Sequence, residues 1–143
     1  MFAYVPRPPS EAEYRAVVDE FWWESLYVAK YVGRGELLPA RYSLETVLRY
    51  RCLIPMLEWY VQVPRQWEQS VGVRGSGLRW LLEPEERTTL DRTYAGETLR
   101  GHAEALTAMI ELFTRAARAV ARDLGFPYPS AVERETRALI DRT

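Results

Sequence analysis

The strongest constraint on the fold is a long apolar stripe in the last third of the sequence. Its members step by alternating four and three positions: Leu99, Ala103, Leu106, Ile110, Phe113, Ala117, Val120 and Leu124. Polar residues such as Glu104 and Arg115 lie off that stripe. Apolar residues at this spacing share one face of an α-helix, and that face needs partners that bury it. The sequence therefore predicts an amphipathic helix over about 99–124 inside a larger helical assembly.

Two earlier segments also have helical character. Ser10 and Glu13 have the spacing of a capping box, which predicts a helix from about residue 11 to about residue 32, where a glycine pair favours its end. A second helical pattern runs over residues 38–63. Pro55 lies inside it, and because proline has no N–H to donate, we expect a kink or a break there.

The remaining segments are shorter. Residues 64–77 hold three glycines and are predicted to form the longest loop, with a short helical piece over residues 78–82. Pro84 after an acidic residue is typical of a helix start. Ser130 and Glu133 repeat the capping-box spacing before a last helix. Because no segment shows the alternation of a strand, the predicted fold class is all-α, an antiparallel bundle of about five or six helices.

Length and composition define what kind of chain this is. With 143 residues and 48% apolar residues, it has the size of one domain and excludes a disordered chain. We expect residues 1–9, which contain three prolines, to be a linker or lead-in, and residues 10–143 to be a single helical domain.

Charge and cysteine content exclude several functions. A formal net charge of −1 gives no basic surface for nucleic acid, and no apolar run is long enough to span a membrane, so a cytoplasmic location is expected. The single cysteine, Cys52, excludes a disulfide framework and is interpreted as a packing residue. The single histidine, His102, excludes a His/Cys zinc site and is interpreted as a surface or partly buried structural residue.

The predicted first helix carries acids and aromatic rings together. At about 100° per residue, one face holds four of them: Glu20, Glu24, Tyr27 and Tyr31. Trp23 and Lys30, the only lysine among nineteen basic residues, lie on the neighbouring stripe. Such a surface could hold a cationic, hydroxyl-rich ligand on one side and an anionic ligand on the other. The alternative is that the tryptophans belong to the core and the charges are simply solvated.

Two other places repeat this chemistry. They are the run Glu58, Trp59 and Tyr60 in the second helical segment, and Tyr94 with Glu97 and Glu104 further on. Each group, taken by itself, is more typical of an ordinary helix surface than of a ligand-binding site. No nucleophile stands at a defined spacing from His102, so the residues alone indicate a helical bundle with a polar and aromatic groove.

Several segments resemble one known family. The runs FWWESLYVAK (residues 21–30) and RGELLPARYSL (residues 34–44) resemble the aminoglycoside 6-adenylyltransferases, which modify streptomycin. Matching segments continue in the family's order at residues 56–59, 75–78, 93–96, 104–106 and 124–129. The resemblance extends from about Pro9 to the last helix, and it concerns the C-terminal, helical half of the family. It implies that an N-terminal nucleotidyltransferase domain, which carries a Gly-Ser motif and paired aspartates for Mg²⁺ and ATP, is absent from this chain.

The resemblance also implies roles for individual residues. Lys30 would reach the phosphates of ATP, and the aminoglycoside would lie against five residues: Trp23, Glu24, Tyr27, Glu58 and Trp59. Tyr94 and Glu97 are further candidates for contact with the drug. The chain itself would supply no catalytic residue and no metal ligand.

The sequence thus leads to one hypothesis and one alternative. The first is the substrate-binding domain of an aminoglycoside adenylyltransferase, inactive by itself, with ATP and Mg²⁺ used by the complete enzyme. The alternative is a non-catalytic helical partner subunit of a separate nucleotidyltransferase. In either case an exposed aromatic patch around Trp22, Trp23 and Tyr27 is expected, through which a homodimer could form.

Overall fold

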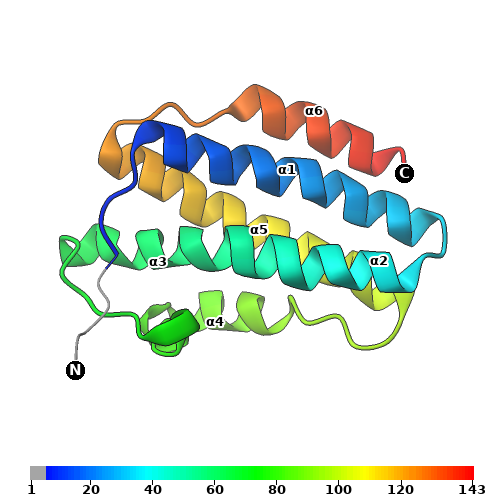
Figure 1. Cartoon of the computed structure of the whole chain (residues 1–143), viewed down its shortest axis with the longest axis horizontal. Helices are drawn as coiled ribbons and strands as arrows, with labels where there is room; N and C mark the ends of the chain where they lie inside the picture. The colour runs from blue at the N-terminus through cyan, green and yellow to red at the C-terminus, as the bar shows by residue number, and fades with distance from the viewer. Residues whose placement is uncertain (1–5) are drawn as a thin grey trace.

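The protein is described by a computed structural model covering residues 6–143, and every regular element in that range is helical (Figure 1). The six α-helices are α1 (Glu11–Gly33), α2 (Leu37–Tyr42), α3 (Ile54–Gln62), α4 (Pro84–Asp91), α5 (Leu99–Leu124) and α6 (Ser130–Asp141). A π-helical segment, η1 (Ser43–Leu53), joins α2 to α3, and three 3₁₀ turns follow: η2 (Val63–Arg65), η3 (Val73–Gly75) and η4 (Arg79–Leu81). The predicted all-α fold is confirmed.

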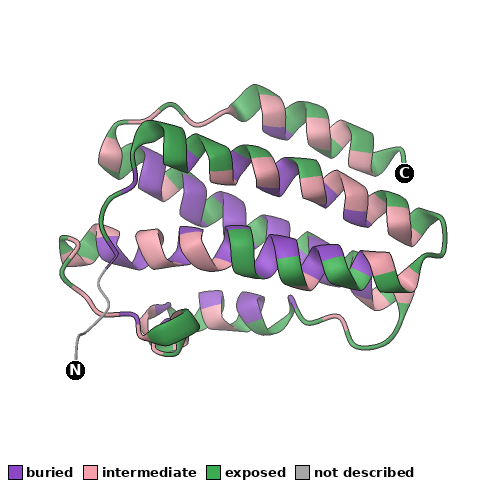
Figure 2. Ribbon diagram, in the orientation of Figure 1, coloured by how far each residue is buried: buried purple, intermediate pink, exposed green. Residues whose placement is uncertain are grey.

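Helix α5 lies at the centre of the bundle. Helix α1 and the rod formed by α2, η1 and α3 run antiparallel to each other and both pack on α5 (Figure 1). Helix α4 packs on α5, and α6 packs along α1. Their buried sides face inward (Figure 2). At the centre, the rings of Phe21 and Phe113 stack with centroids 3.7 Å apart and an angle of 7° between their planes, and neither residue is exposed.

The helices predicted over about 11–32 and 99–124 are confirmed, each with one predicted end signal. The Glu13 N–H donates to Ser10 Oγ and the Ser10 N–H donates to Glu13 Oε1, each at a distance of 3.1 Å. These two bonds form the capping box expected at the start of α1. Helix α5 ends at Gly125, whose φ of 74° is the left-handed conformation of a C-terminal cap. Its apolar stripe is buried from Leu106 to Val120, with Ala103 exposed.

The rod formed by α2, η1 and α3 shows how a proline is accommodated without a break. The predicted helical pattern over 38–63 is present, and Pro55 falls in the first turn of α3, directly after η1. In η1 each N–H reaches five residues back, and the last such bond runs from the Ile54 N–H to the Arg49 carbonyl. Because Pro55 has no N–H, the hydrogen-bond register changes there from five residues to four. The expected break is therefore a change of helix type.

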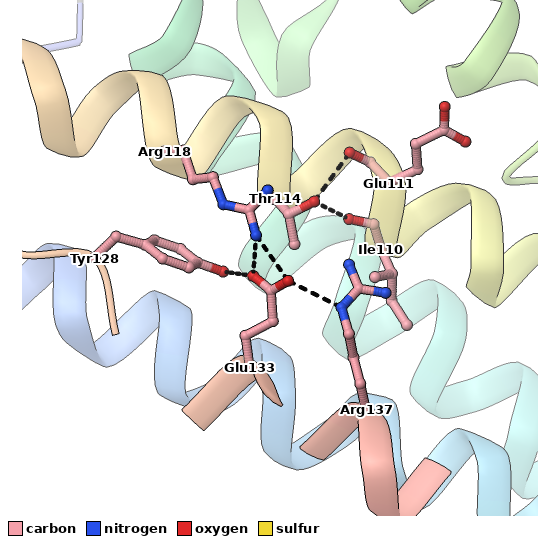
Figure 3. Close-up of polar contacts among 7 residues, drawn as sticks. All are labelled: Ile110, Glu111, Thr114, Arg118, Tyr128, Glu133 and Arg137. Atoms are coloured by element: carbon pink, nitrogen blue, oxygen red, sulfur yellow. Dashed lines mark hydrogen bonds and ion pairs between the residues drawn. The ribbon is translucent and has the colours of Figure 1, made fainter. Parts of the chain in front are cut away.

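The start of α6 contradicts the predicted capping box. Ser130 is the first residue of α6 rather than its N-cap, and its side chain caps nothing. The Glu133 carboxylate instead accepts hydrogen bonds from Arg118 Nη2 (2.8 Å to each oxygen), from the Tyr128 hydroxyl (2.6 Å) and from Arg137 Nε (2.9 Å), as Figure 3 shows. We call these four residues the Glu133 cluster. It ties α6 to α5 because charged donors on both helices take the carboxylate that a capping box would use.

The connecting segments complete the fold. The predicted loop over residues 64–77 contains η3 and the end of η2, and the short helical piece expected over 78–82 is the turn η4. Residues 1–5 of the expected lead-in lie outside the described residues, and residues 6–10 form neither helix nor strand. Across the described range, no helix is both long and apolar enough to cross a membrane.

Candidate functional site

The polar and aromatic face predicted for the first helix is present on α1. The Trp23 and Tyr27 ring centroids lie 5.4 Å apart, those of Tyr27 and Tyr31 lie 6.1 Å apart, and Lys30 Nζ is 5.7 Å from the Tyr27 centroid. We call these four residues the α1 stripe. Trp23 is 63% exposed and Lys30 is exposed, so both can meet a ligand. Trp22, which was expected in the exposed patch, is 1% exposed: it points into the core, one helical position from Trp23.

Two carboxylates accompany the α1 stripe where α1 packs on η1. Glu20 Oε1 lies 3.0 Å from Arg51 Nη2. Glu24 is half-buried and has no hydrogen-bond or ion-pair partner within residues 6–143. Both acids lie near Cys52: the pKa of the Cys52 thiol is raised to about 12, mainly by burial and to a smaller extent by the charges of Glu20 and Glu24. Cys52 is fully buried, as its interpretation as a packing residue predicts.

Helix α3 carries a second half-buried carboxylate. Glu58 has no hydrogen-bond or ion-pair partner in the part of the chain that the structure describes, and burial raises the pKa of its carboxyl above the usual 4.5. Its neighbour Trp59 is half-buried and lines a cavity of about 170 Å³ together with Pro6, Pro9 and other residues of the N-terminal segment. The ring of Trp59 therefore lies near the start of α1, and Glu58, one position earlier on α3, is not part of that cavity lining.

The third group lies on the loop between α4 and α5. Tyr94 is 60% exposed and lines a cavity of about 460 Å³, the α5 cavity, whose other walls are Arg92, Ala95, Gly101, Glu104, Thr107, Ala108 and Glu111. Glu97, on the same loop, is exposed and is not part of this lining. The cavity thus carries two carboxylates and one guanidinium around an aromatic wall.

The predicted residues therefore occupy three separate places. Glu13, which shares the cavity of Trp59, and Lys30 are 17 positions apart on α1, which is about 25 Å at 1.5 Å per residue. Arg51 contacts α1, whereas Arg49 contacts the loop that carries Tyr94. Two residues that are two positions apart on a helix point about half a turn apart. Tyr94 and the α1 stripe consequently lie on opposite flanks of η1.

One residue that the sequence analysis missed organises the Tyr94 loop. Arg49 is 1% exposed, although arginine side chains are seldom fully buried. Its guanidinium donates hydrogen bonds to Glu45, four positions earlier, and to Thr93 in the loop. The same group stacks over the ring of Tyr94. The spacing of Glu45 and Arg49 was visible in the sequence, but Thr93 is 44 positions away, so no local pattern indicated the contact.

His102 is more deeply buried than predicted. It is fully buried in α5, with Nδ1 2.6 Å from the Thr98 carbonyl oxygen, and its Nε2 has no hydrogen-bond partner. Residues 6–143 contain no group of three His, Cys, Asp or Glu side chains placed to hold a metal ion.

The comparison with known proteins decides the family. The family model for streptomycin adenylyltransferase matches residues 2–143. The chain belongs to this family. It is 27% identical over 134 residues to the aminoglycoside 6-adenylyltransferase of Bacillus subtilis (strain 168), covering 94% of this chain and 47% of that protein. It is 29% identical over 127 residues to the Staphylococcus aureus enzyme of the same name, covering 89% and 45% respectively.

The fold of this family member also matches a solved relative. A crystal structure of an aminoglycoside 6-adenyltransferase from Bacillus subtilis aligns with a TM-score of 0.82 at 26% identity, over 95% of this chain and 51% of that one. The resemblance inferred from the sequence is confirmed at the level of the family. The chain spans about half the length of the relatives it matches.

Proposed function

We propose that the chain is the helical substrate-binding part of an aminoglycoside adenylyltransferase, of the streptomycin-modifying type. In this proposal the complete enzyme transfers AMP from ATP to a hydroxyl group of the drug, and the nucleotidyltransferase half supplies the catalytic groups and the Mg²⁺ ligands. The family match and the coverage of about half of each relative support this assignment. Residues 10–143 are then one domain, which binds and orients the drug and has no activity alone.

The observation that carries the proposal is the unpaired carboxylate of Glu58. A half-buried carboxylate without a partner raises the free energy of the empty site, because burial penalises its charge. An ammonium or guanidinium group of an aminoglycoside would remove that penalty through a charge-assisted hydrogen bond. Glu24, also half-buried, offers the same chemistry on α1, and the rings of Trp23, Tyr27 and Trp59 offer faces for cations or sugar rings.

Lys30 would bind the phosphates of the nucleotide. Its exposed ammonium lies beside the Tyr27 ring and has no acidic partner among residues 6–143, so it is available to an anion. Bound ATP would supply the AMP group and the pyrophosphate that leaves. An ammonium at this position would offset the negative charge on those phosphates.

Tyr94 and Glu97 form a separate candidate contact for the drug. They lie on the other flank of η1, next to a cavity of about 460 Å³, which is large enough for a sugar ring. Since the α1 stripe lies on the opposite flank of η1, the Tyr94 loop is an alternative place for the drug, whose cationic groups we assign to the α1 and α3 residues.

Calorimetry with streptomycin tests the proposal. The chain should bind the drug weakly alone and more tightly when a nucleotidyltransferase half from a relative is added. Replacing Glu58 by glutamine should weaken binding several-fold, whereas the matched variant Glu135→Gln, which alters an exposed acid on α6, should leave it unchanged. Absence of heat in both settings, or equal effects of the two variants, would contradict the assignment. The partner-subunit alternative uses the same drug-binding surface. It would be favoured if this chain and a separate nucleotidyltransferase chain, mixed at their native concentrations, transfer AMP.

The same variant makes a prediction about stability. Because burial raises the pKa of Glu58 in the folded state, its charge disfavours folding at neutral pH, and this cost disappears as the pH falls through the folded-state pKa. Glu58→Gln should therefore stabilise the free protein at pH 7 and lose its advantage in acid. Urea unfolding at both pH values measures this, and a variant that is less stable than the parent at pH 7 would indicate that Glu58 is already paired.

A further inference from the structure

The carboxylate at the centre of the Glu133 cluster has no capacity left for a further donor. It accepts two hydrogen bonds from Arg118 Nη2, one from the Tyr128 hydroxyl and one from Arg137 Nε (Figure 3). A carboxylate offers about four lone-pair sites, so Glu133 is saturated. Each arginine reaches it through a single nitrogen, although a guanidinium carries five N–H donors. Most donors of the two arginines therefore find no acceptor in the cluster.

The Glu133 cluster also carries an excess of positive charge. Among residues 6–143, Glu133 is the only acid that forms an ion pair with Arg118 or Arg137, so two guanidinium groups share one carboxylate. Two further charges lie one helical turn away: Arg122 follows Arg118 on α5, and Asp141 follows Arg137 on α6. Neither of them forms an ion pair in the part of the chain that the structure describes. Because these two charges offset each other, the surroundings of the cluster remain positive.

Two aromatic rings support the guanidinium groups without using their N–H donors. Arg118 Cζ lies 5.2 Å from the centroid of the Tyr128 ring, and Arg137 Cζ lies 5.5 Å from the centroid of the Trp22 ring. The two arginine side chains are nevertheless 51% and 44% exposed, so a ligand can reach them from solvent. Trp22 itself is 1% exposed, and its indole N–H has no hydrogen-bond acceptor within residues 6–143. A buried donor without an acceptor adds to the demand for negative charge at this place.

The two guanidinium groups are close enough to bind one ligand together. Arg118 Nη2 and Arg137 Nε both donate to Glu133 Oε2, over 2.8 and 2.9 Å, so these nitrogens are less than about 6 Å apart. Arg118 approaches from α5 and Arg137 from α6 (Figure 3). A planar carboxylate is matched by one guanidinium, as Glu133 shows, whereas a tetrahedral phosphate has oxygens for donors from two directions.

We propose that Arg118 and Arg137 bind the phosphate group of a small molecule. Neither residue belongs to the α1 stripe or lines the α5 cavity, so this site is separate from the residues assigned to the drug and to ATP. Glu133 is the positioning residue, because it holds both guanidinium groups in place and neutralises only one of them. Bound phosphate would strengthen the link between α5 and α6, since its two partners lie on different helices.

Titration of the parent protein with inorganic phosphate tests the site. The arginine Nε–H signals of ¹⁵N-labelled protein are followed by nuclear magnetic resonance at pH 7, with the ionic strength held constant by sodium chloride. The Arg118 and Arg137 signals should shift with one common dissociation constant, whereas the signal of Arg100, an exposed arginine of α5 that pairs with Glu104, should not. Acetate should bind several-fold more weakly than phosphate. No shift at Arg118 and Arg137, an equal shift at Arg100, or acetate binding as tight as that of phosphate would overturn the proposal.

A variant measures the contribution of one arginine. A ligand that binds only the folded protein raises the urea concentration at which it unfolds, and the readout is this phosphate-induced increase within each protein. Arg137→Met should weaken phosphate binding about tenfold, as expected for the loss of one charge-assisted hydrogen bond, whereas the control Arg100→Met should leave it unchanged. Equal phosphate binding by Arg137→Met and the parent would refute the shared site. If Arg137→Met does not fold, the titration of the parent decides. Neither probe involves streptomycin, so this outcome is independent of the proposed function.

Discussion

Replacing Glu133 by glutamine should destabilise the bundle by removing the side-chain link between α6 and α5. The carboxylate is 9% exposed and accepts four hydrogen bonds, three of them from arginines. Hydrogen bonds to charged groups contribute about 1.5–3 kcal/mol each when well buried. The two arginine side chains are 51% and 44% exposed, so they regain water when the charge is removed. We therefore expect a loss of about 2 kcal/mol for the whole cluster, which lowers Tm by about 6–8 °C in a chain of this size.

The effect should also depend on pH in a defined direction. Burial raises the pKa of Glu133, but the hydrogen bonds from Tyr128 and Arg137 and the charges of Arg118 and Arg137 outweigh it, and the pKa lies below the usual 4.5. Since the folded-state pKa is lower than the unfolded one, the stabilisation is present at neutral pH and is lost as the pH falls through the folded-state value. The difference between parent and variant should therefore shrink in acid.

Urea unfolding followed by tryptophan fluorescence measures both effects. Glu135→Gln is the matched control, because Glu135 lies on the exposed side of the same helix and makes no ion pair among residues 6–143. If Glu133→Gln and Glu135→Gln unfold at the same urea concentration at pH 7, the cluster does not stabilise the attachment of α6. A difference that grows in acid would contradict the assigned direction of the pKa shift.

Two further changes test packing directly. Gly101→Ala should cost about 1–3 kcal/mol in urea unfolding, because a Cβ there would lie 2.1 Å from the Ala95 carbonyl oxygen and the loop would have to move; an unchanged stability would show that the loop yields freely. Cys52 should react with a thiol reagent at pH 8 only as fast as the protein unfolds, since it is buried and its pKa is raised to about 12; rapid reaction of the folded protein would contradict its packing role.

The parts of the fold that could be predicted depend on neighbours in sequence. Ser10 and Glu13 cap α1 with groups three positions apart, and the apolar period of α5 follows from the geometry of one helix. The spacing at Ser130 and Glu133 is the same, yet it gives no capping box. The difference lies in Arg118, fifteen positions before Glu133, whose side chain reaches from α5 to the carboxylate on α6. A capping box is thus a local preference that a charged partner from another helix can override.

In the candidate site, too, the features that depend on one helix could be predicted, whereas those that depend on contacts between helices could not. That Trp23, Tyr27 and Lys30 share a surface is a property of one helix, and it was visible in the sequence. That Trp22 is core while Trp23 is surface depends on which side of α1 meets α5, which the pattern of two adjacent tryptophans leaves open.

Arg49 is the clearest case in which tertiary structure changes the meaning of a residue that the sequence did identify. Tyr94 was predicted as a ligand contact from its residue type, and an aromatic ring beside acids would normally be assigned to a cation. The guanidinium that covers one of its faces comes from η1, 45 positions earlier. Because the two residues are so far apart in the sequence, no local pattern around Tyr94 indicates that one face of its ring is already covered. Assigning ligand chemistry to an aromatic residue therefore requires knowing what already occupies its other face.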